Sequence, residues 1–397
     1  MSTEDEVYAF VKGSSDAKGL LSGIKLAEDS GNVVLRNDAE VASAKDLVGF
    51  DVDGFFSALS TDGLGRTLLA SKRLSSTHTL VSKSFETLPI GTVCISRIQY
   101  SGRGRGGNTW ESPEGCLMFS LSLRWVDGRT LPLLQYVLSL AVVQAIEDMA
   151  KERGTSLPQV ALKWPNDIFL GGLKVGGVLC TSSYRNRAFD VTVGIGLNVD
   201  NTHPTTCINA ALQAARPSAP PVSHEALLAA LLNRLHSLLT VFEQQGFKPL
   251  EADYLQRWLH SGQHVVLEEP KEGGGTTQVS LTIQGLTTGG YLLATDPSGV
   301  QYELSPDGNR VEDVYLLISS LSFDLLPSFQ IATLLPSFQS FPSPSFPSFP
   351  SFPPFPSFPP FPSFPSSPPS PPLLSTCLLR LAHGISLRDP RPHAQCA

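Results

Sequence analysis

A stretch of glycine and arginine, Tyr100-Ser-Gly-Arg-Gly-Arg-Gly-Gly-Asn-Thr-Trp110, carries residue types suited to binding an anion. Glycine permits a positive φ and lets main-chain N–H groups come close to a ligand. Successive free N–H groups form an anion-binding concavity. The guanidinium groups of Arg103 and Arg105 add permanent charges whose planar shape matches phosphate or carboxylate oxygens. The stretch predicts a loop that closes over an anionic ligand, although a solvated turn or an RNA-binding RGG tract has a similar composition.

Two further segments combine lysine with turn-forming residues. Lys163-Trp-Pro-Asn-Asp167 leads from an apolar run into a turn, and Lys174-Val-Gly-Gly177 follows the Gly171-Gly172 turn of a predicted hairpin. In both segments a solvent-facing lysine is the simpler interpretation. A later run, 190–199, alternates like a half-buried strand, and its Gly194 and Gly196 indicate close approach of a ligand or another backbone.

The elements that must position these residues follow from hydrophobic spacing. Strands are predicted over 93–100 and 117–124, on either side of the Gly/Arg stretch, so that the loop hangs from a sheet. Ser76 or Thr77 is expected to cap a helix running toward Phe85, whose first turn would present hydroxyl and N–H groups. Longer amphipathic helices are predicted over 131–153 and 224–244, with a shorter one over 249–259.

The two ends of the chain differ in composition and hydrophobic pattern. Residues 1–50 are weakly patterned and predict a small extra lobe or a partly disordered segment. Four short strands between His264 and Leu304, separated by Gly- and Pro-containing turns, predict a small β-barrel or sandwich. Beyond about Val311 the chain cycles through Pro, Ser and Phe, a composition that favours disorder or polyproline II structure.

Composition limits the classes of function. The chain has 397 residues and a formal net charge of −7, which argues against broad affinity for nucleic acid or anionic membranes. The six cysteines are widely spread without metal-ligand spacing, so we expect reduced thiols, no metal site and a cytoplasmic protein. We also expect that no segment is long and apolar enough to span a bilayer.

Taken in order and spacing, these motifs resemble the biotin protein ligases, most closely the plant-type holocarboxylase synthetases. The resemblance runs from about Phe50 to about Asn309 and includes Ser76-Thr-His78, the segment 111–120 and Gly194-Ile-Gly-Leu-Asn198. It implies an α/β catalytic domain like that of class II aminoacyl-tRNA synthetases, followed by a small SH3-like β-barrel. The expected division is a variable N-terminal segment (1–50), a catalytic domain (51–260), an SH3-like domain (261–312) and a disordered tail (313–397).

The resemblance also implies a reaction and its residues. Biotin and ATP, with Mg²⁺, would give biotinyl-5′-AMP and pyrophosphate, and a lysine of a carboxylase biotin-acceptor domain would then attack the adenylate. Neither nucleic acid nor a membrane is an expected partner. The implied catalytic residues are Arg103, Arg105 and Lys163. Those implied to bind biotin are Ser76, Thr77, His78, Gln99, Arg103, Gly104, Arg105 and Lys163. Those implied to bind ATP or the adenylate are Gly102, Trp110, Asn166, Lys174 and Asn198.

Three alternatives remain open on sequence grounds. A lipoate ligase would share the architecture, although the Gly-Arg-Gly-Arg loop and Lys163-Trp-Pro-Asn-Asp167 favour biotin. An RNA-binding or scaffold protein would use the Gly/Arg stretch and the Pro-rich tail. An inactive relative is the third alternative, because Val311 onward replaces the short ending expected of plant-type relatives. That replacement suggests read-through into non-coding sequence or an alternative transcript, which a transcript continuous across 308–321 would contradict.

Overall fold

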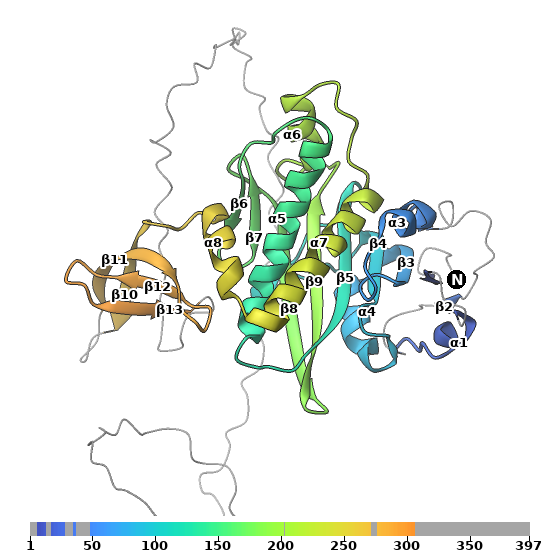
Figure 1. The fold of residues 1–397 in the computed structure, drawn as a ribbon, viewed down its shortest axis with the longest axis horizontal. Coiled ribbons are helices and arrows are strands. Elements are labelled where there is room, and N and C mark those ends of the chain that lie inside the picture. Colours follow the sequence, from blue (N-terminus) through green and yellow to red (C-terminus); the bar gives the residue numbers. More distant parts are fainter. Residues whose placement is uncertain are drawn as a thin grey trace, which may run out of the picture. The chain divides into compact units, whose positions relative to one another are not determined.

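The computed structural model of the chain describes residues 6–12, 17–27, 35–36, 48–201, 203–270 and 276–305. They form a nine-stranded sheet in the order β2-β1-β3-β4-β5-β9-β8-β7-β6 and a four-stranded sheet in the order β10-β11-β12-β13 (Figure 1). The strands of the large sheet are β1 (Val7–Val11), β2 (Leu35–Arg36), β3 (Thr67–Leu74), β4 (Val93–Gln99), β5 (Cys116–Trp125), β6 (Val160–Lys163), β7 (Asp167–Leu170), β8 (Leu173–Arg185) and β9 (Ala188–Asn198).

The helices occupy the connections between these strands and the segment that follows β9. They are α1 (Ala17–Ser22), α3 (Val52–Ala58), α4 (Thr77–Ser84), α5 (Leu134–Glu152), α6 (Ile208–Ala215), α7 (His224–Gln245) and α8 (Lys248–Arg257), with short 3-10 turns η2 (Phe85–Thr87), η3 (Arg105–Gly107) and η4 (Leu131–Leu133). The fold is therefore a mixed α/β fold built on one large sheet, as the sequence predicted at this level.

Strand pairing places distant segments side by side. β3 and β4 run parallel, whereas β4, β5, β9, β8, β7 and β6 are joined by successive antiparallel pairs. The β5–β9 pair opposes Ser120 with Gly194 and Met118 with Gly196. Two segments more than seventy residues apart in the chain thus form one continuous surface at the middle of the sheet.

Alternating side chains give the sheet two apolar faces. Tyr8, Leu68 and Ile95 belong to the main core, whereas Val7, Leu69 and Cys94 belong to a second cluster with Leu80 and Val81 of α4. Because neighbouring strand residues point to opposite faces, α4 and α1 cover one face. The helices α5 and α7 lie side by side on the other.

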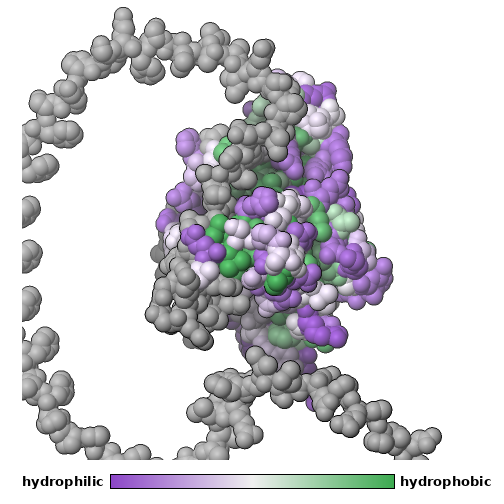
Figure 2. Space-filling model, turned by 90° about the vertical axis from the view of Figure 1, so that its left-hand side faces the viewer, coloured by the Kyte–Doolittle hydropathy of each residue, from purple (hydrophilic) through white to green (hydrophobic). Residues whose placement is uncertain are grey.

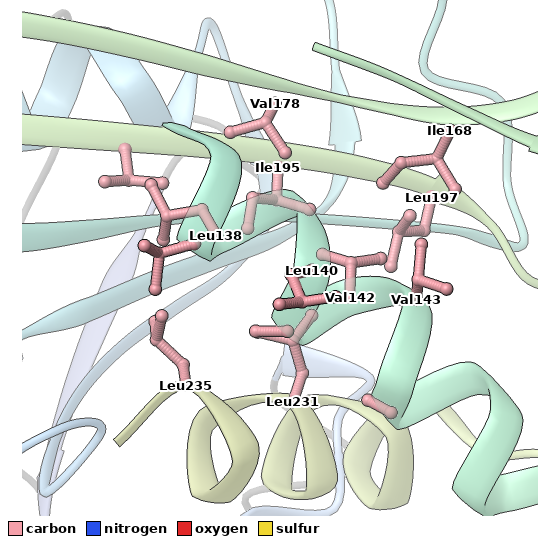
Figure 3. Close-up of a cluster of buried hydrophobic side chains, with 14 of the residues drawn as sticks. Leu138, Leu140, Val142, Val143, Ile168, Val178, Ile195, Leu197, Leu231 and Leu235 are labelled. Atoms are coloured by element: carbon pink, nitrogen blue, oxygen red, sulfur yellow. The ribbon is translucent and has the colours of Figure 1, made fainter. Parts of the chain in front are cut away.

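The main core lies between α5, α7 and the sheet. Figure 3 shows Leu138, Leu140, Val142 and Val143 of α5 between side chains of β7, β8 and β9 above and Leu231 and Leu235 of α7 below. Every one of these side chains is buried. Because α5 packs against the sheet on one side and against α7 on the other, apolar residues occur almost all the way around this helix.

The expectation that no segment is long and apolar enough to cross a membrane was wrong. Helical segments 131–152 and 224–245 both meet that criterion by length and hydropathy, but 78% and 50% of their apolar windows are buried inside the fold. In α5 the apolar residues contact α7 and the sheet, so its hydropathy reflects a core position. Such core helices pass the same test as a membrane span.

Most element boundaries follow the predictions, and the exceptions are local. The predicted helix over 131–153 begins as the 3-10 turn η4 before α5, and Gly154, with φ of +66°, follows its end. Gly171 and Gly172 both adopt the positive φ expected of the β7–β8 turn. The helix α6 was not predicted, and β1 joins the large sheet through β3 rather than forming an extra lobe.

The C-terminal strands form an antiparallel sheet of β10 (His264–Pro270), β11 (Thr276–Leu286), β12 (Leu292–Thr295) and β13 (Gln301–Leu304). Hydrophobic and hydrophilic residues are interspersed on the described surface seen from this side of the molecule (Figure 2). The predicted tail, 313–397, lies outside the described residues, as do residues 306–312 of the predicted SH3-like domain.

Candidate active site

A cavity of about 540 Å³ lies on the face of the large sheet opposite α5. Ser120, Gly194 and Gly196 form its floor, and they alternate along β5 and β9 with the core residues Phe119 and Ile195. Its walls come from the first turn of α4, the end of β4, the Gly/Arg loop, the turn after β6 and the start of β8. A volume of this size suits a small organic ligand.

One wall, the helix wall, consists of Ser76, Thr77, His78 and Gln99. Ser76 caps α4 by accepting a hydrogen bond from the Thr79 N–H, as its sequence position predicted. The main-chain N–H of Thr77 donates to Oε1 of Gln99 at 2.7 Å, and its hydroxyl donates to the same oxygen at 3.1 Å. The Thr77 hydroxyl also lies 2.9 Å from that of Ser120. These bonds fix a row of polar groups along the cavity.

His78 lines the cavity and also forms hydrogen bonds with strands of the sheet. Its Nε2 lies 3.1 Å from the hydroxyl of Thr181, and the ring also hydrogen-bonds the main chain of Thr192. Burial lowers its pKa below the ordinary value of 6.5, the Thr192 bond opposes this effect, and the nearby Arg103 charge adds to it. A neutral ring whose hydrogen bonds are made by β8 and β9 serves to dock α4 on the sheet.

The Gly/Arg loop folds back on itself as a small hairpin. Arg103 and Thr109 form an antiparallel bridge, Trp110 N–H donates to the Gly102 carbonyl at 3.0 Å, and Gly104 N–H donates to the Asn108 carbonyl at 2.7 Å. Arg103, Arg105 and the main chain between them line the cavity. The loop therefore places two guanidinium-bearing residues in the lining of the cavity.

Trp110 closes one end of the cavity by lying on the floor. A Cβ atom added to Gly196 would lie 2.6 Å from Cε2 of the indole and 2.7 Å from its Nε1. The Nε1 atom is buried and faces the thiol of Cys116 instead of an oxygen acceptor. Burial raises the pKa of that thiol to about 12, so it stays protonated.

The opposite wall, the hairpin wall, consists of Pro165, Asn166, Asp167 and Lys174. The ammonium of Lys174 lies 2.6 Å from a carboxylate oxygen of Asp167 and 5.8 Å from the centre of the Trp110 ring. Asn166 donates from Nδ2 to the Val178 carbonyl at 2.8 Å, and the Val178 N–H donates to the Asn166 carbonyl at 2.9 Å. Those bonds pin the turn after β6 against β8.

The structure brings most of the predicted site residues together and leaves three aside. The cavity is lined by Ser76, Thr77, His78, Gln99, Arg103, Gly104, Arg105, Trp110, Asn166 and Lys174. Gly102 packs against the other side of the loop, where a Cβ would lie only 2.6 Å from the Trp110 carbonyl oxygen and would not fit. Lys163 directs its ammonium to within 5.9 Å of the Phe169 ring centre. Asn198 is buried, and its amide bonds Asn201 and Thr205.

Some lining residues were not selected from the sequence. Ser120 is fully buried, and its hydroxyl lies within hydrogen-bond distance of the Thr77 hydroxyl. Its only feature in the sequence is a serine within an apolar strand, which is common in sheets. Asp167 belongs to a segment that the sequence predicts either to shape a turn or to contact the ligand, and it lines the cavity. Gly194 and Gly196 are predicted to lie close to a ligand or another part of the chain. In the structure each lies close to an aromatic side chain: a Cβ on Gly194 would lie 3.2 Å from the His78 ring.

The arrangement can bring two anions together. Arg103, Arg105 and Lys174 supply positive charge, while the start of α4 and the polar helix wall supply fixed donors and acceptors. Preorganised charges of this kind stabilise negative charge that develops during group transfer, because they need no reorganisation at the moment of reaction. A carboxylate on the helix-wall side and a phosphate on the hairpin-wall side would both face the Gly/Arg loop.

Comparison with known proteins defines the class of protein first: residues 70–198 match the Biotin/lipoate A/B protein ligase family. Biotin–protein ligase 2 of Arabidopsis thaliana is 48% identical over 290 residues, which cover 73% of this chain and 88% of that protein. Biotin–protein ligase 1, chloroplastic, of the same plant is 46% identical over 75% of this chain and 81% of that protein. This chain belongs to the biotin–protein ligase family.

Solved structures of the same kind are also similar. A biotin protein ligase from Aquifex aeolicus in complex with biotin and ATP has 26% sequence identity and a TM-score of 0.47, covering 59% of this chain and 93% of that one. The human biotin–protein ligase is 31% identical over 68% of this chain and 37% of its own length.

Proposed function

We propose that the chain is an ATP-dependent ligase that activates biotin and transfers it to a lysine of carboxylase acceptor domains. An oxygen of the biotin carboxylate attacks the α-phosphorus of ATP, pyrophosphate leaves, and biotinyl-5′-AMP forms. The lysine amine then attacks the acyl carbon, and AMP leaves with the electron pair of the broken C–O bond. The observation that carries this proposal is the Gly/Arg loop standing over a floor that joins two polar walls.

Biotin fits the helix-wall side of the cavity. The ring of biotin carries N–H donors and a carbonyl acceptor. Thr77, Gln99 and Ser120 offer hydroxyl and amide groups already ordered by mutual bonds, and the Ser76 hydroxyl is held by the Thr79 N–H. Ordered partners reduce the entropy lost on binding. His78 contributes by holding this wall, and Arg103, Gly104 and Arg105 face the carboxylate end.

ATP and the adenylate fit the hairpin-wall side. Lys174 and Asn166 line that side, Trp110 supplies a flat apolar surface, and Gly102 and Asn198 support the segments around it. Lys163, at the end of β6, is proposed to contact the reacting groups; because its ammonium lies 5.9 Å from the centre of the Phe169 ring in the structure, this role requires a different side-chain rotamer. The loop also shields the adenylate from water, which would otherwise hydrolyse it.

Mg²⁺ fits as a companion of the ATP phosphates. Asp167 is the carboxylate that lines the cavity, and within the described residues no cluster of three or more His, Cys, Asp or Glu side chains is suited to a metal. Magnesium is commonly held by one or two carboxylates together with substrate phosphates. When bound, it would offset phosphate charge, while Arg103, Arg105 and Lys174 orient the reactants.

The C-terminal sheet β10–β13 is proposed to be the described part of an SH3-like barrel that helps to receive the acceptor domain. The catalytic domain is proposed to resemble class II aminoacyl-tRNA synthetases. A cytoplasmic location is proposed as well, and the free thiols of Cys94, Cys116, Cys180 and Cys207 are consistent with a reducing compartment. Cell fractionation with an antibody to the chain would test that location.

The deciding experiment measures transfer of labelled biotin to a purified acceptor domain with ATP and Mg²⁺, using the full chain. We expect transfer by the native protein and losses of about 10²- to 10³-fold in Lys163→Ala and Arg105→Ala. Arg129→Ala is the matched control, because Arg129 lies on the surface paired with Asp127. Lipoate in place of biotin tests the related ligase, and an RNA-binding protein would tolerate Lys163→Ala.

If transfer is missing, biotin-dependent ATP–pyrophosphate exchange decides between two outcomes. Exchange without transfer would locate the defect in acceptor binding, in keeping with an altered C-terminal end. Absence of both reactions would refute the proposed ligase.

A further inference from the structure

A buried histidine outside the cavity holds the main chain of the hairpin wall. The N–H of Trp164 donates to Nε2 of His260 at 2.9 Å, across 96 residues of sequence. His260 is only 6% exposed, and Trp258 packs edge-on against its ring with 5.5 Å between ring centres. Trp164 stands immediately before Pro165, Asn166 and Asp167, so this bond lies at the root of the hairpin wall.

The hydrogen bonds of His260 fix its protonation. A main-chain N–H can only donate, so Nε2 must carry a lone pair. Nδ1 lies 2.6 Å from Oε1 of Gln263 and therefore carries the proton. Burial lowers the pKa of His260 below the ordinary value of 6.5, the Gln263 bond opposes this effect, and the charge of Lys163 adds to it. The neutral acceptor form thus prevails around neutral pH.

The segment that carries His260 is continuous with the C-terminal sheet. The Leu259 N–H donates to the Leu162 carbonyl of β6 at 2.9 Å, while the Ile283 N–H of β11 donates to the Gln263 carbonyl at 2.9 Å. The segment 259–263 therefore bonds β6 at one end and β11 at the other.

A second contact joins the same tryptophan to the C-terminal sheet. The indole Nε1 of Trp164 donates to the Tyr136 hydroxyl at 2.7 Å, and that hydroxyl donates to the carbonyl of Gly290, in the turn before β12. Gly290 has φ of +86°, and a Cβ there would lie 3.0 Å from Leu133. Both the main chain and the indole of Trp164 are consequently held by groups that contact the C-terminal sheet.

We propose that His260 is a positioning residue that, with Tyr136, transmits the placement of the C-terminal sheet to the hairpin wall of the cavity. It does not touch the substrates; it acts through Trp164 on Asn166 and Asp167. This inference rests on the proposed ligase function and concerns the side of the cavity assigned to ATP. It gives the C-terminal sheet a role in adenylation besides any role in receiving the acceptor.

The test compares His260→Leu with His260→Gln in the full chain by biotin-dependent ATP–pyrophosphate exchange. Leucine leaves the buried Trp164 N–H without an acceptor, whereas glutamine can place Oε1 near the position of Nε2. We expect KM for ATP to rise about tenfold or more in His260→Leu. KM for biotin should stay within about twofold, because the helix wall does not depend on this bond, and His260→Gln should restore most of the ATP affinity.

Two further variants keep the inference testable. Ser261→Ala is the matched control, since Ser261 accepts a hydrogen bond from Trp258 Nε1 in the same segment but does not contact Trp164; it should behave as the native chain. Should His260→Leu fail to fold, Tyr136→Phe removes the second contact and should raise KM for ATP in the same direction.

The outcomes separate the two proposals. Native exchange with unchanged KM for ATP in His260→Leu, or in Tyr136→Phe if the former does not fold, would overturn the positioning role and leave the ligase intact. A fall in kcat alone, with both KM values native, would indicate a smaller active fraction and would also overturn it. Absence of exchange in the native chain would instead refute the ligase function on which the inference rests.

Discussion

The indole of Trp110 lies directly on the backbone of Gly196, at a distance that leaves no room for a side chain at that position. The two residues belong to the Gly/Arg loop and to β9, which approach each other only through the pairing of β5 with β9. Gly177 of β8 also comes near the ring. Gly177 and Gly196 therefore form a flat seat for an aromatic residue at the end of the cavity.

Gly196→Ala is expected to displace Trp110 from this seat. The added Cβ would lie within 2.7 Å of two ring atoms, and overpacking of this kind typically costs about 1–3 kcal/mol. Because the ring lies on a loop that can yield, we expect a modest loss of stability and a rise of about tenfold in KM for ATP. Measurement of exchange kinetics and of the urea midpoint separates the two effects.

Gly285→Ala provides the matched control for that substitution. Gly285 also lies in a strand, but a Cβ there would have no neighbour within 4 Å. Its kinetics should match those of the native chain. Native KM for ATP in Gly196→Ala would show that Trp110 does not contribute to the nucleotide side of the cavity.

Features that depend on residues close together in the chain could be predicted from the sequence. Ser76, one of the two residues predicted as the helix cap, caps α4, and Gly171-Gly172 forms the predicted hairpin turn. Both features depend on residues close together in the chain. The arginines of the Gly/Arg loop line the cavity as predicted, since the flanking strands fix where a short loop can lie.

Contacts between residues far apart in the chain could not be predicted from the sequence, because they depend on how the strands pair. Ser120 enters the floor because β5 pairs with β9, and His260 meets Trp164 because the chain returns to β6 after α6, α7 and α8. The resemblance implies that Asn198 binds ATP or the adenylate, and in the structure its amide bonds Asn201 and Thr205. A side chain's available neighbours, rather than its place in a motif, determine whether it can face a ligand.

Thr77→Val is expected to weaken biotin binding without affecting ATP. The substitution keeps the shape of the side chain but removes the hydroxyl that bonds Gln99 and faces Ser120. Loss of one or two such bonds costs about 0.5–1.5 kcal/mol each, or about a 2- to 100-fold rise in KM for biotin. Exchange kinetics at saturating ATP measure it.

Thr79→Val serves as the control for the helix wall. Thr79 lies on α4 two residues further along and is outside the lining of the cavity described here. Equal KM for biotin in Thr77→Val and Thr79→Val would place biotin elsewhere.

Lys174→Gln is expected to weaken ATP binding and leave biotin affinity unchanged. The substitution removes a positive charge that contacts Asp167 and lies near the Trp110 ring. Hydrogen bonds to charged groups contribute about 1.5–3 kcal/mol, so KM for ATP should rise between about tenfold and about a hundredfold. Lys151→Gln, on the exposed side of α5, is the control, and an equal effect on KM for biotin would contradict the division of the cavity.

Acid should destabilise the fold through His78 and His260, which are both buried. Burial lowers the pKa of both His78 and His260 in the folded state, so below the ordinary value of 6.5 the unfolded chain binds more protons than the folded one. Stability from these groups is fully present above pH 6.5 and is lost as the pH falls below it, by up to about 1.4 kcal/mol per pH unit for each ring. Urea unfolding between about pH 7.5 and about pH 5.5 measures this slope.

His260→Gln and His78→Gln should each flatten the dependence of the unfolding free energy on pH, because glutamine does not titrate. His236→Gln, on the exposed side of α7, is the control and should retain the native slope. The positive charge of Arg103 acts on His78 and that of Lys163 acts on His260, and each opposes protonation of the ring. An equal slope in all three variants would mean that carboxylates, and not these rings, set the acid limit of the fold.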